Sequence, residues 1–206
     1  MGHPADIVGH PAIATRGSEM RKLIYSMGVS LDGFVAGPAG EIDWSTPDAE
    51  LHRFHNQQAR ETGVQLYGRR LYETMRFWET AGQDPSASEP VVEFARIWRD
   101  TPKLVFSRTL DSVEGSNTAL ARGELAEEVA RLKDESGKDL AVGGAGLAAS
   151  CIQLNLVDEY RLFVSPVILG GGTPYFPALE ERISLELVET RTFGSRVVYL
   201  RYARAA

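Results

Sequence analysis

Apolar residues along this chain follow two spacings, one typical of strands and the other typical of helices. The segment Glu124–Asp134 repeats them every third or fourth position, which predicts a helix with one apolar face. The segment Asp158–Ser165 alternates apolar with polar residues, which predicts a strand. The other predicted strands are Lys22–Ser30, Val64–Tyr67, Lys103–Ser107, Asp139–Val142, Leu185–Arg191 and Arg196–Tyr202. Four other helices are predicted. The first begins at Pro47 with Thr46 as its cap, and the second follows Gly68-Arg69-Arg70. The third contains Val91, Phe94 and Trp98, and the fourth covers Leu147–Leu154.

Strands and helices alternate through most of the chain, an order typical of α/β proteins. We therefore expect a mostly parallel central sheet with helices on its faces. The turn Thr192–Ser195 joins the last two strands, so we expect an antiparallel hairpin at the C-terminus. The segment 1–19 has no periodic apolar face, and we expect it to be a disordered leader or tag. The predicted domain then covers residues 20–206.

The composition is that of an ordinary globular protein, with 206 residues, 43% of them apolar, and a net charge of −6. This charge argues against nucleic-acid or membrane-surface binding, which needs a basic face. No apolar run is long enough to span a bilayer. The single cysteine, Cys151, stands among apolar helix positions, so we expect a buried core thiol. A lone cysteine also suggests a reducing compartment, and we expect a cytoplasmic protein.

Two strand-to-helix turns are candidates for anion binding. In the first, Gly143–Leu147, small residues would let a phosphate approach the free N–H groups of the following helix. The alternative, that these glycines only make a tight turn, is equally good on this segment alone. In the second, Gly68-Arg69-Arg70, two cations stand at a helix start, where they oppose the helix dipole. That conflict favours an anion ligand over a solvated arginine pair.

Three further segments carry weaker signals. Ser107-Arg108 follows a strand and combines a hydroxyl with a guanidinium that can bind phosphate, although a plain turn explains it better. The Asp32-Gly33 turn with Trp44 downstream can be a loop over a ligand or a turn with a buried anchor. The run Leu169–Tyr175 contains three consecutive glycines, which permit unusual backbone torsions or a flexible loop.

Taken in order, these five segments resemble the dihydrofolate reductase superfamily. They look closest to its branch with the reductase (C-terminal) domain of the bifunctional riboflavin-biosynthesis deaminase-reductases and their stand-alone relatives. The match covers Met20 to Tyr202. The resemblance implies a dihydrofolate-reductase-like three-layer α/β fold, an NADPH cofactor and a homodimer. The residues that it implicates for the cofactor are Ala36 and Trp44 at the nicotinamide, Gly68, Arg69 and Arg70 at the phosphates, Ser107 and Arg108 at the 2′-phosphate, and Gly143, Gly144, Ala145, Gly146 and Leu147 at the pyrophosphate.

On the substrate side, the resemblance implicates Thr173 and Tyr175. Two departures from the family pattern change the expected chemistry. Gly143 stands where the deaminase-reductases place an acidic, substrate-contacting residue, which puts a pyrimidine ribose-phosphate substrate in question. One cysteine and four histidines without ligand spacing cannot supply a zinc-deaminase domain, and we expect no metal site.

The candidate proton donor is Asp48, because dihydrofolate reductases place a carboxylate after a Trp-x-x-Pro stretch at a helix start. The residues alone favour an ordinary partner of the helix dipole at Asp48 over a proton donor, and Glu50 and Asp32 are alternative acids. His52 and His55 are three positions apart on this helix, and we expect them to be solvated rather than metal ligands.

The resemblance thus implies an NADPH-dependent oxidoreductase of the dihydrofolate reductase type. It would transfer hydride to a small heterocyclic or carbonyl substrate and would resemble 5-amino-6-(5-phosphoribosylamino)uracil reductase of riboflavin biosynthesis. The alternative is a nucleotide-binding module of the same fold that has no turnover.

Overall fold

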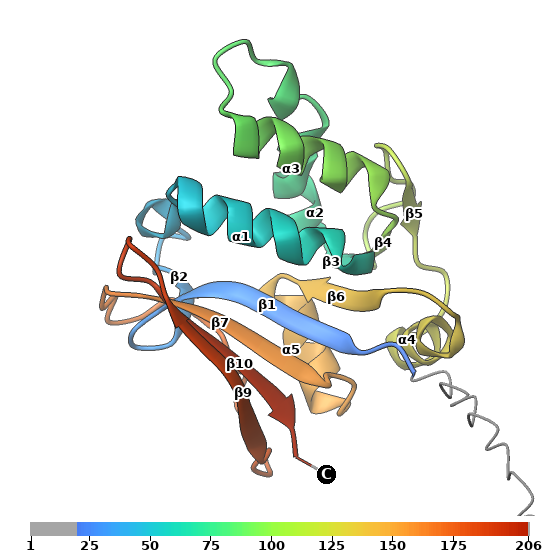
Figure 1. The fold of residues 1–206 in the computed structure, drawn as a ribbon. Helices are drawn as coiled ribbons and strands as arrows, with labels where there is room; N and C mark the ends of the chain where they lie inside the picture. The colour runs from blue at the N-terminus through green and yellow to red at the C-terminus, as the bar shows by residue number, and fades with distance from the viewer. Residues whose placement is uncertain (1–19, 206) are drawn as a thin grey trace, which may run out of the picture.

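The computed structural model describes residues 20–205, so the predicted leader at 1–19 lies outside the described part (Figure 1). An eight-stranded sheet has the order β5-β4-β3-β6-β1-β7-β10-β9. The pairs from β5 to β7 are parallel, and β10 is antiparallel to both β7 and β9. The strands of this sheet are β1 (Leu23–Ser30), β3 (Thr62–Gly68), β4 (Lys103–Phe106), β5 (Thr118–Leu120), β6 (Asp139–Gly143), β7 (Glu159–Ser165), β9 (Leu185–Thr192) and β10 (Val198–Arg204).

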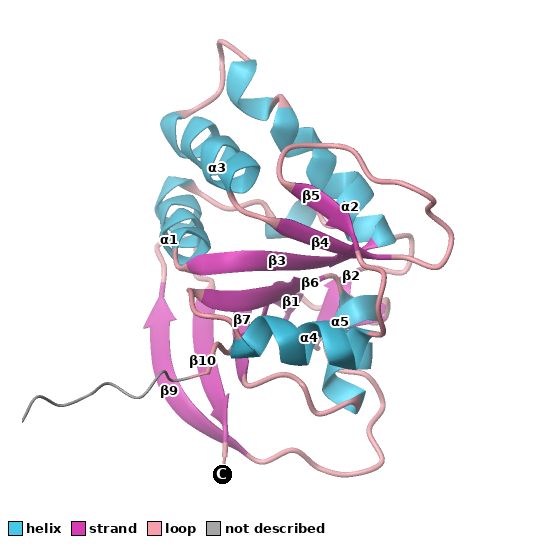
Figure 2. Ribbon diagram, turned by 90° about the vertical axis from the view of Figure 1, so that its right-hand side faces the viewer, coloured by secondary structure: helices cyan, strands magenta, loops and turns pink. Residues whose placement is uncertain are grey.

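Helices cover both faces of the sheet, which gives the three layers that the sequence predicts (Figure 2). On one face lie α1 (Ala49–Arg60), α2 (Arg69–Met75) and α3 (Glu89–Asp100). On the other lie α4 (Leu125–Asp134) and α5 (Ala145–Gln153). Short 3-10 turns, η1 (Asp43–Ser45), η2 (Arg76–Glu79) and η3 (Ala81–Gln83), connect the elements of the first face. The α/β class, the mostly parallel sheet and the antiparallel C-terminal hairpin are therefore confirmed.

The main core lies between the sheet and helices α4 and α5. Alternating residues of β1, such as Leu23 and Tyr25, are fully buried there beside Val129 of α4 and Ile152 of α5. Cys151 is also buried in this core, as the sequence predicts. Burial raises the pKa of its thiol to about 12, so the thiol stays protonated at neutral pH.

A second, two-stranded sheet joins β2 (Phe34–Ala36) to β8 (Thr173–Pro174). The Asp32 carboxylate strengthens this junction by accepting the backbone N–H groups of Leu169 and Gly170 at 2.7–3.2 Å. The Asp32-Gly33 turn and the triple-glycine segment are thus held together. Strands of two or three residues have no detectable period, so the sequence did not predict this sheet or β5.

The start of α1 differs from the prediction. Asp48, and not Thr46, is the N-cap, and its Oδ1 accepts the backbone N–H of Leu51 at 2.8 Å. Pro47 therefore precedes the helix instead of beginning it. Helix α5 begins at Ala145, two residues before the predicted start, because Gly144 adopts the positive φ that closes the turn. Among residues 20–205, no helix combines the length and apolar character needed to cross a bilayer.

Candidate active site

The structure brings the predicted phosphate-binding segments together at one edge of the sheet. Tyr67 of β3 pairs with Gly143 of β6, and Gly68 pairs with Phe106 of β4. Gly68, Gly143 and Ser107 therefore lie at the carboxyl ends of three adjacent parallel strands. Ligands of open α/β sheets bind at this edge.

The glycine turn after β6 packs so closely against α2 that side chains are excluded from it. A Cβ at Gly143 would lie 2.6 Å from Cδ2 of Leu71, and one at Gly144 would lie 3.2 Å from Cβ of Leu71. Gly144 also has a φ of 87°, which L-residues rarely adopt. Gly146, by contrast, faces open space.

Helix α5 begins without a side-chain cap and without an acidic residue in its first turn. Its first backbone N–H groups therefore have no side-chain acceptor, and the helix dipole makes this end positive. Gly146 in the first turn leaves room for a ligand to approach these groups. The turn thus fits the pyrophosphate that the sequence assigned to it.

The predicted phosphate-binding arginines, Arg69, Arg70 and Arg108, stand at this edge and are solvent-exposed. Arg69 forms a 3.6 Å ion pair with Glu73 one helical turn later, while Arg70 and Arg108 point to solvent. The Ser107 hydroxyl accepts two backbone N–H groups of the following turn, at 3.1 Å each. Ser107 therefore shapes the loop that presents Arg108, and the arginines fit a phosphate ligand.

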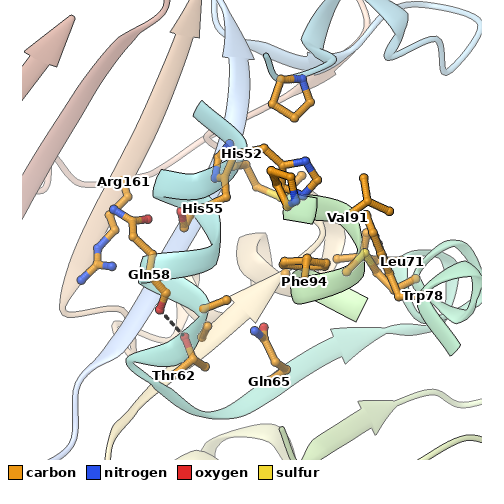
Figure 3. Close-up of a pocket in the computed structure, with 18 of the residues that line it drawn as sticks. His52, His55, Gln58, Thr62, Gln65, Leu71, Trp78, Val91, Phe94 and Arg161 are labelled. Carbon is orange, nitrogen blue, oxygen red and sulfur yellow. Dashed lines mark hydrogen bonds between the residues drawn. The ribbon is translucent and has the colours of Figure 1, made fainter. Parts of the chain in front are cut away.

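A cavity of about 660 Å³ lies next to the glycine turn, between the sheet and helices α1 and α3 (Figure 3). This size is typical of pockets for small organic ligands. Gly143 belongs both to the glycine turn and to the wall of the cavity. The floor comes from the sheet, with Ile24, Ser26, Gln65, Tyr67, Ala141, Val142 and Arg161. The helical walls include His52, His55, Gln58, Leu71, Met75, Trp78, Val91 and Phe94.

His52 and His55 both line this cavity and are half-buried, so they are less exposed than the solvated histidines that the sequence predicts. The ring of His55 packs 4.2 Å from the ring of Phe163, and His52 lies edge-on to Trp78 and Phe94 at about 6 Å. Burial, and then the neighbouring His52, lower the pKa of His55 to about 4. Burial also lowers the pKa of His52, against the charge of Glu93. Both imidazoles are therefore neutral at pH 7.

A buried amide holds α1 and α3 together at this cavity. Asn56 is fully buried, and its Nδ2 donates hydrogen bonds to the carbonyl oxygen of Pro90 at 2.9 Å and to Glu93 at 2.8 Å. His52 and His55 precede Asn56 on α1, so this contact holds their helix against α3.

A buried ion cluster supports the other end of the cavity. Glu159 is nearly inaccessible, and its carboxylate binds Arg161 at 2.6 Å and Arg201 at 2.9–3.0 Å. Burial would raise the pKa of Glu159, but the hydrogen bond from Arg201 and the charge of Arg161 together lower it. The two arginines of this cluster are thus balanced by two carboxylates, Glu159 and Glu189, which lies 3.8 Å from Arg201.

We expect Glu159→Gln to destabilise the protein by about 3 kcal/mol, because removing one partner leaves buried charges unpaired. The melting temperature should fall by roughly 6–12 °C. Glu186→Gln, on exposed β9, is the matched control and should shift it by about 2 °C or less.

The pH dependence should identify the carboxylate as the cause. A folded-state pKa below the unfolded value of about 4.3 gives stability that is present above that pH and lost as the pH falls. Thermal unfolding from pH 7 to 3 should therefore show the wild-type advantage shrinking below about pH 4. An advantage that persists unchanged at pH 3 would contradict this role.

Of the three acids considered from the sequence, Asp48 lines the cavity. Asp32 is held by the Ser30 hydroxyl and by backbone N–H groups, which lower its pKa. The backbone N–H of Gly194 and then Arg191 likewise lower the pKa of Glu50. Asp32 and Glu50 are therefore ionised at neutral pH and engaged elsewhere, whereas Asp48 caps α1 at the edge of the cavity.

The four remaining predicted residues lie outside the cavity wall. Ala36 pairs with Thr173 between β2 and β8. The half-buried Trp44 donates its indole N–H to the Glu41 carbonyl at 3.3 Å. Tyr175 is buried against Tyr25 in the main core, and its hydroxyl donates to the carbonyl oxygens of Tyr25 and Arg161.

The structure groups no three potential metal ligands within the described residues 20–205. The site combines an edge that fits a phosphate with a cavity lined by four neutral polar side chains, Ser26, His52, His55 and Gln65.

Comparison with known proteins identifies the family. The model of the RibD C-terminal domain matches residues 21–199. The chain belongs to the RibD C-terminal domain family. Within the curated proteins, the uncharacterized protein YyaP of Bacillus subtilis (strain 168) is 37% identical over 191 residues, which are 91% of this chain and 97% of YyaP. The uncharacterized protein YwjB of the same organism is 29% identical over 90% of this chain and 99% of its own.

Solved structures share the fold of this RibD C-terminal domain. A protein of Shewanella sp. PV-4 named for riboflavin biosynthesis is 22% identical with a TM-score of 0.71, over 91% of this chain and 100% of its own. The Thermotoga maritima deaminase/5-amino-6-(5-phosphoribosylamino)uracil reductase is 14% identical with a TM-score of 0.62, over 90% and 57%. Enterococcus faecalis dihydrofolate reductase, complexed with NADP(H), is 14% identical with a TM-score of 0.60, over 90% and 97%. The dihydrofolate-reductase-like fold is therefore confirmed.

Proposed function

We propose that this protein is an NADPH-dependent reductase of a small heterocyclic or carbonyl compound. The observation that carries the proposal is the position of Gly143, which is shared by the glycine turn and the cavity. A dinucleotide held at the turn and a substrate held in the cavity would meet at this residue. Membership of the RibD C-terminal domain family and the NADP(H) complex of a structural neighbour support the choice of cofactor.

In this proposal a bound nicotinamide supplies a hydride to a C=N or C=O carbon, and a proton completes the reduction. The chain contributes the rest. The start of α5 and the arginines hold the phosphates, and the walls of α1 and α3 position the substrate and exclude water. Asp48, or a water molecule that it orients, supplies the proton.

The test is a titration of the full chain with NADPH and NADH, followed by a substrate screen that monitors loss of NADPH absorbance. Turnover of any small heterocycle or carbonyl compound supports the proposal. NADPH binding without turnover across the screen would favour a nucleotide-binding module, and absence of NADPH binding would overturn both.

The family match favours 5-amino-6-(5-phosphoribosylamino)uracil as one substrate to include in that screen. The cavity opposes it, because Gly143 offers no side chain to the substrate and Arg161 is paired with Glu159. Turnover of this compound would make the protein a riboflavin-pathway reductase in activity as well as in family.

We expect Arg108→Ala to weaken NADPH binding about tenfold or more and to leave NADH binding unchanged. The guanidinium is exposed beside the predicted phosphate edge, and a charge-assisted hydrogen bond contributes about 1.5–3 kcal/mol. Calorimetric titration of both cofactors measures the difference. Arg182→Ala is the control, because this exposed arginine lies just before β9, at the opposite edge of the sheet. An equal loss of affinity for both cofactors would show that Arg108 does not bind the 2′-phosphate.

A further inference from the structure

The cavity has an aromatic wall, which we define as His52, Trp78 and Phe94. The rings of Trp78 and Phe94 meet edge to face at 4.5 Å, and His52 lies 6.1–6.2 Å from both. Figure 3 shows these residues contributed by α1, η2 and α3 around one side of the cavity. Flat, rigid rings of this kind contact planar ligands favourably, by stacking or by edge-to-face packing.

Four neutral polar side chains of the cavity have spare hydrogen-bonding capacity. Ser26 and Gln65 extend from the sheet, and His52 and His55 from α1. In the described part of the chain, these four side chains make no hydrogen bond to another protein group. Neutral imidazole and amide groups each offer both a donor and an acceptor. They can therefore satisfy the N–H and C=O groups at the edge of a heterocycle.

The charges of the cavity disfavour an anionic ligand. Its lining contains one formal cation, Arg161, whose Nε is bound to Glu159 at 2.6 Å. In Figure 3 the guanidinium of Arg161 points away from Phe94, across α1. The positive end of α1 is occupied by the carboxylate of its own cap, Asp48. A buried phosphate or carboxylate would thus lose its hydration without gaining a free cation.

We propose that the cavity selects an uncharged aromatic or heteroaromatic substrate, with hydrogen-bonding groups on its edge, and rejects phosphorylated or carboxylated analogues. This inference rests on the proposed function, since it takes the cavity to be the substrate side of the reductase. It names a substrate class different from a ribose phosphate.

The experiment is a calorimetric titration of the full chain, without cofactor, with two ligands of the same skeleton. The first ligand, quinazolinone, is uncharged and planar and has an amide edge. The second ligand is a quinazolinone that carries a carboxylate on its ring, which adds one negative charge. We expect quinazolinone to bind, and the carboxylate to bind at least about tenfold more weakly, because burying an unpaired charge is costly. Uridine 5′-phosphate tests the phosphate class in the same way and should not bind in the cavity.

Two variants locate the binding. Phe94→Leu keeps most of the side-chain volume but removes a ring of the aromatic wall, and should weaken quinazolinone binding about tenfold. His52→Leu is a second, independent variant, because it removes another ring of the aromatic wall together with its hydrogen-bonding nitrogens. Arg96→Gln lies on the exposed side of the same helix α3 and is the matched control, expected to bind normally.

The outcomes separate this inference from the proposed function. Equal or tighter binding of the carboxylate, no binding of quinazolinone, or normal binding by both cavity variants would each overturn the inference. A separate NADPH titration tests the cofactor. If the wild type binds quinazolinone as expected but does not bind NADPH, the proposed reductase fails while the selectivity of the cavity stands.

Discussion

Replacing Gly146 by valine should weaken NADPH binding by about a hundredfold or more and leave the melting temperature nearly unchanged. Gly146 lies in the first turn of α5, and no atom is within 4 Å of the position that its Cβ would take. A branched side chain there would fill the space through which phosphate oxygens reach the backbone N–H groups. Loss of two charge-assisted hydrogen bonds, at about 1.5–3 kcal/mol each, accounts for this factor.

Comparison with Gly144→Val shows why Gly146 is the better position. Gly144 has a φ of 87°, so valine there would be strained by about 1–3 kcal/mol and would lower stability as well as binding. Gly146 is helical, where valine is no worse than glycine. Calorimetric titration with NADPH, together with thermal unfolding, separates the two effects. Wild-type NADPH affinity in Gly146→Val would show that the turn is only structural.

The sequence predicted the layers of the fold because its signals were local. Alternating strand positions, helical stripes and a short turn at Thr192–Ser195 are each readable within one segment. The adjacency of Gly68 and Gly143 was not predicted, because it depends on the strand order, in which β3 lies between β4 and β6. Their shared role in phosphate binding stays a prediction.

The cavity could not be read from the sequence, because its walls come from distant segments. Trp78 follows α2, Phe94 lies in α3, and Arg161 belongs to β7. One signal was present. His52, His55 and Ala59 repeat at helical spacing on α1, and all three line the cavity. Because imidazoles were counted as polar, these three positions were not recognised as the side of α1 that faces the cavity.

Tyr175 illustrates the opposite difficulty. The family resemblance implicated it in substrate contact, and a tyrosine is suited to either role. In the structure the ring packs 4.3 Å from Tyr25, and two carbonyl oxygens satisfy the hydroxyl. Which face a residue takes after an irregular loop depends on the torsions of that loop, and these glycines impose no preference.

The start of α1 was misplaced because two residues could serve as its cap. Thr46 before Pro47 has the pattern of a helix start, and so does Asp48 three residues before Leu51. The structure selects Asp48, and Thr46 instead donates to the carbonyl of Asp43. The outcome matters for function, because the candidate acid is also a structural cap.

Asp48→Asn should lower the rate of substrate reduction about 10²–10⁴-fold while leaving NADPH binding and the melting temperature nearly unchanged. General acid catalysis contributes a factor of about this size, and asparagine caps helices about as well as aspartate. Stopped-flow measurement of NADPH oxidation, with a substrate found in the screen, tests the rate. Asp48→Ala adds the loss of the cap, about 1 kcal/mol, so the Asn variant isolates the acid.

The matched control for this acid is Glu50→Gln on the same helix. Glu50 binds Arg191 and the Gly194 N–H, and it lies outside the cavity wall, so its loss should leave the rate unchanged. Wild-type turnover in Asp48→Asn would make Asp48 a cap alone. The proton would then come from solvent, because Asp32 and Glu50 are both held as carboxylates by the hydrogen bonds that lower their pKa values.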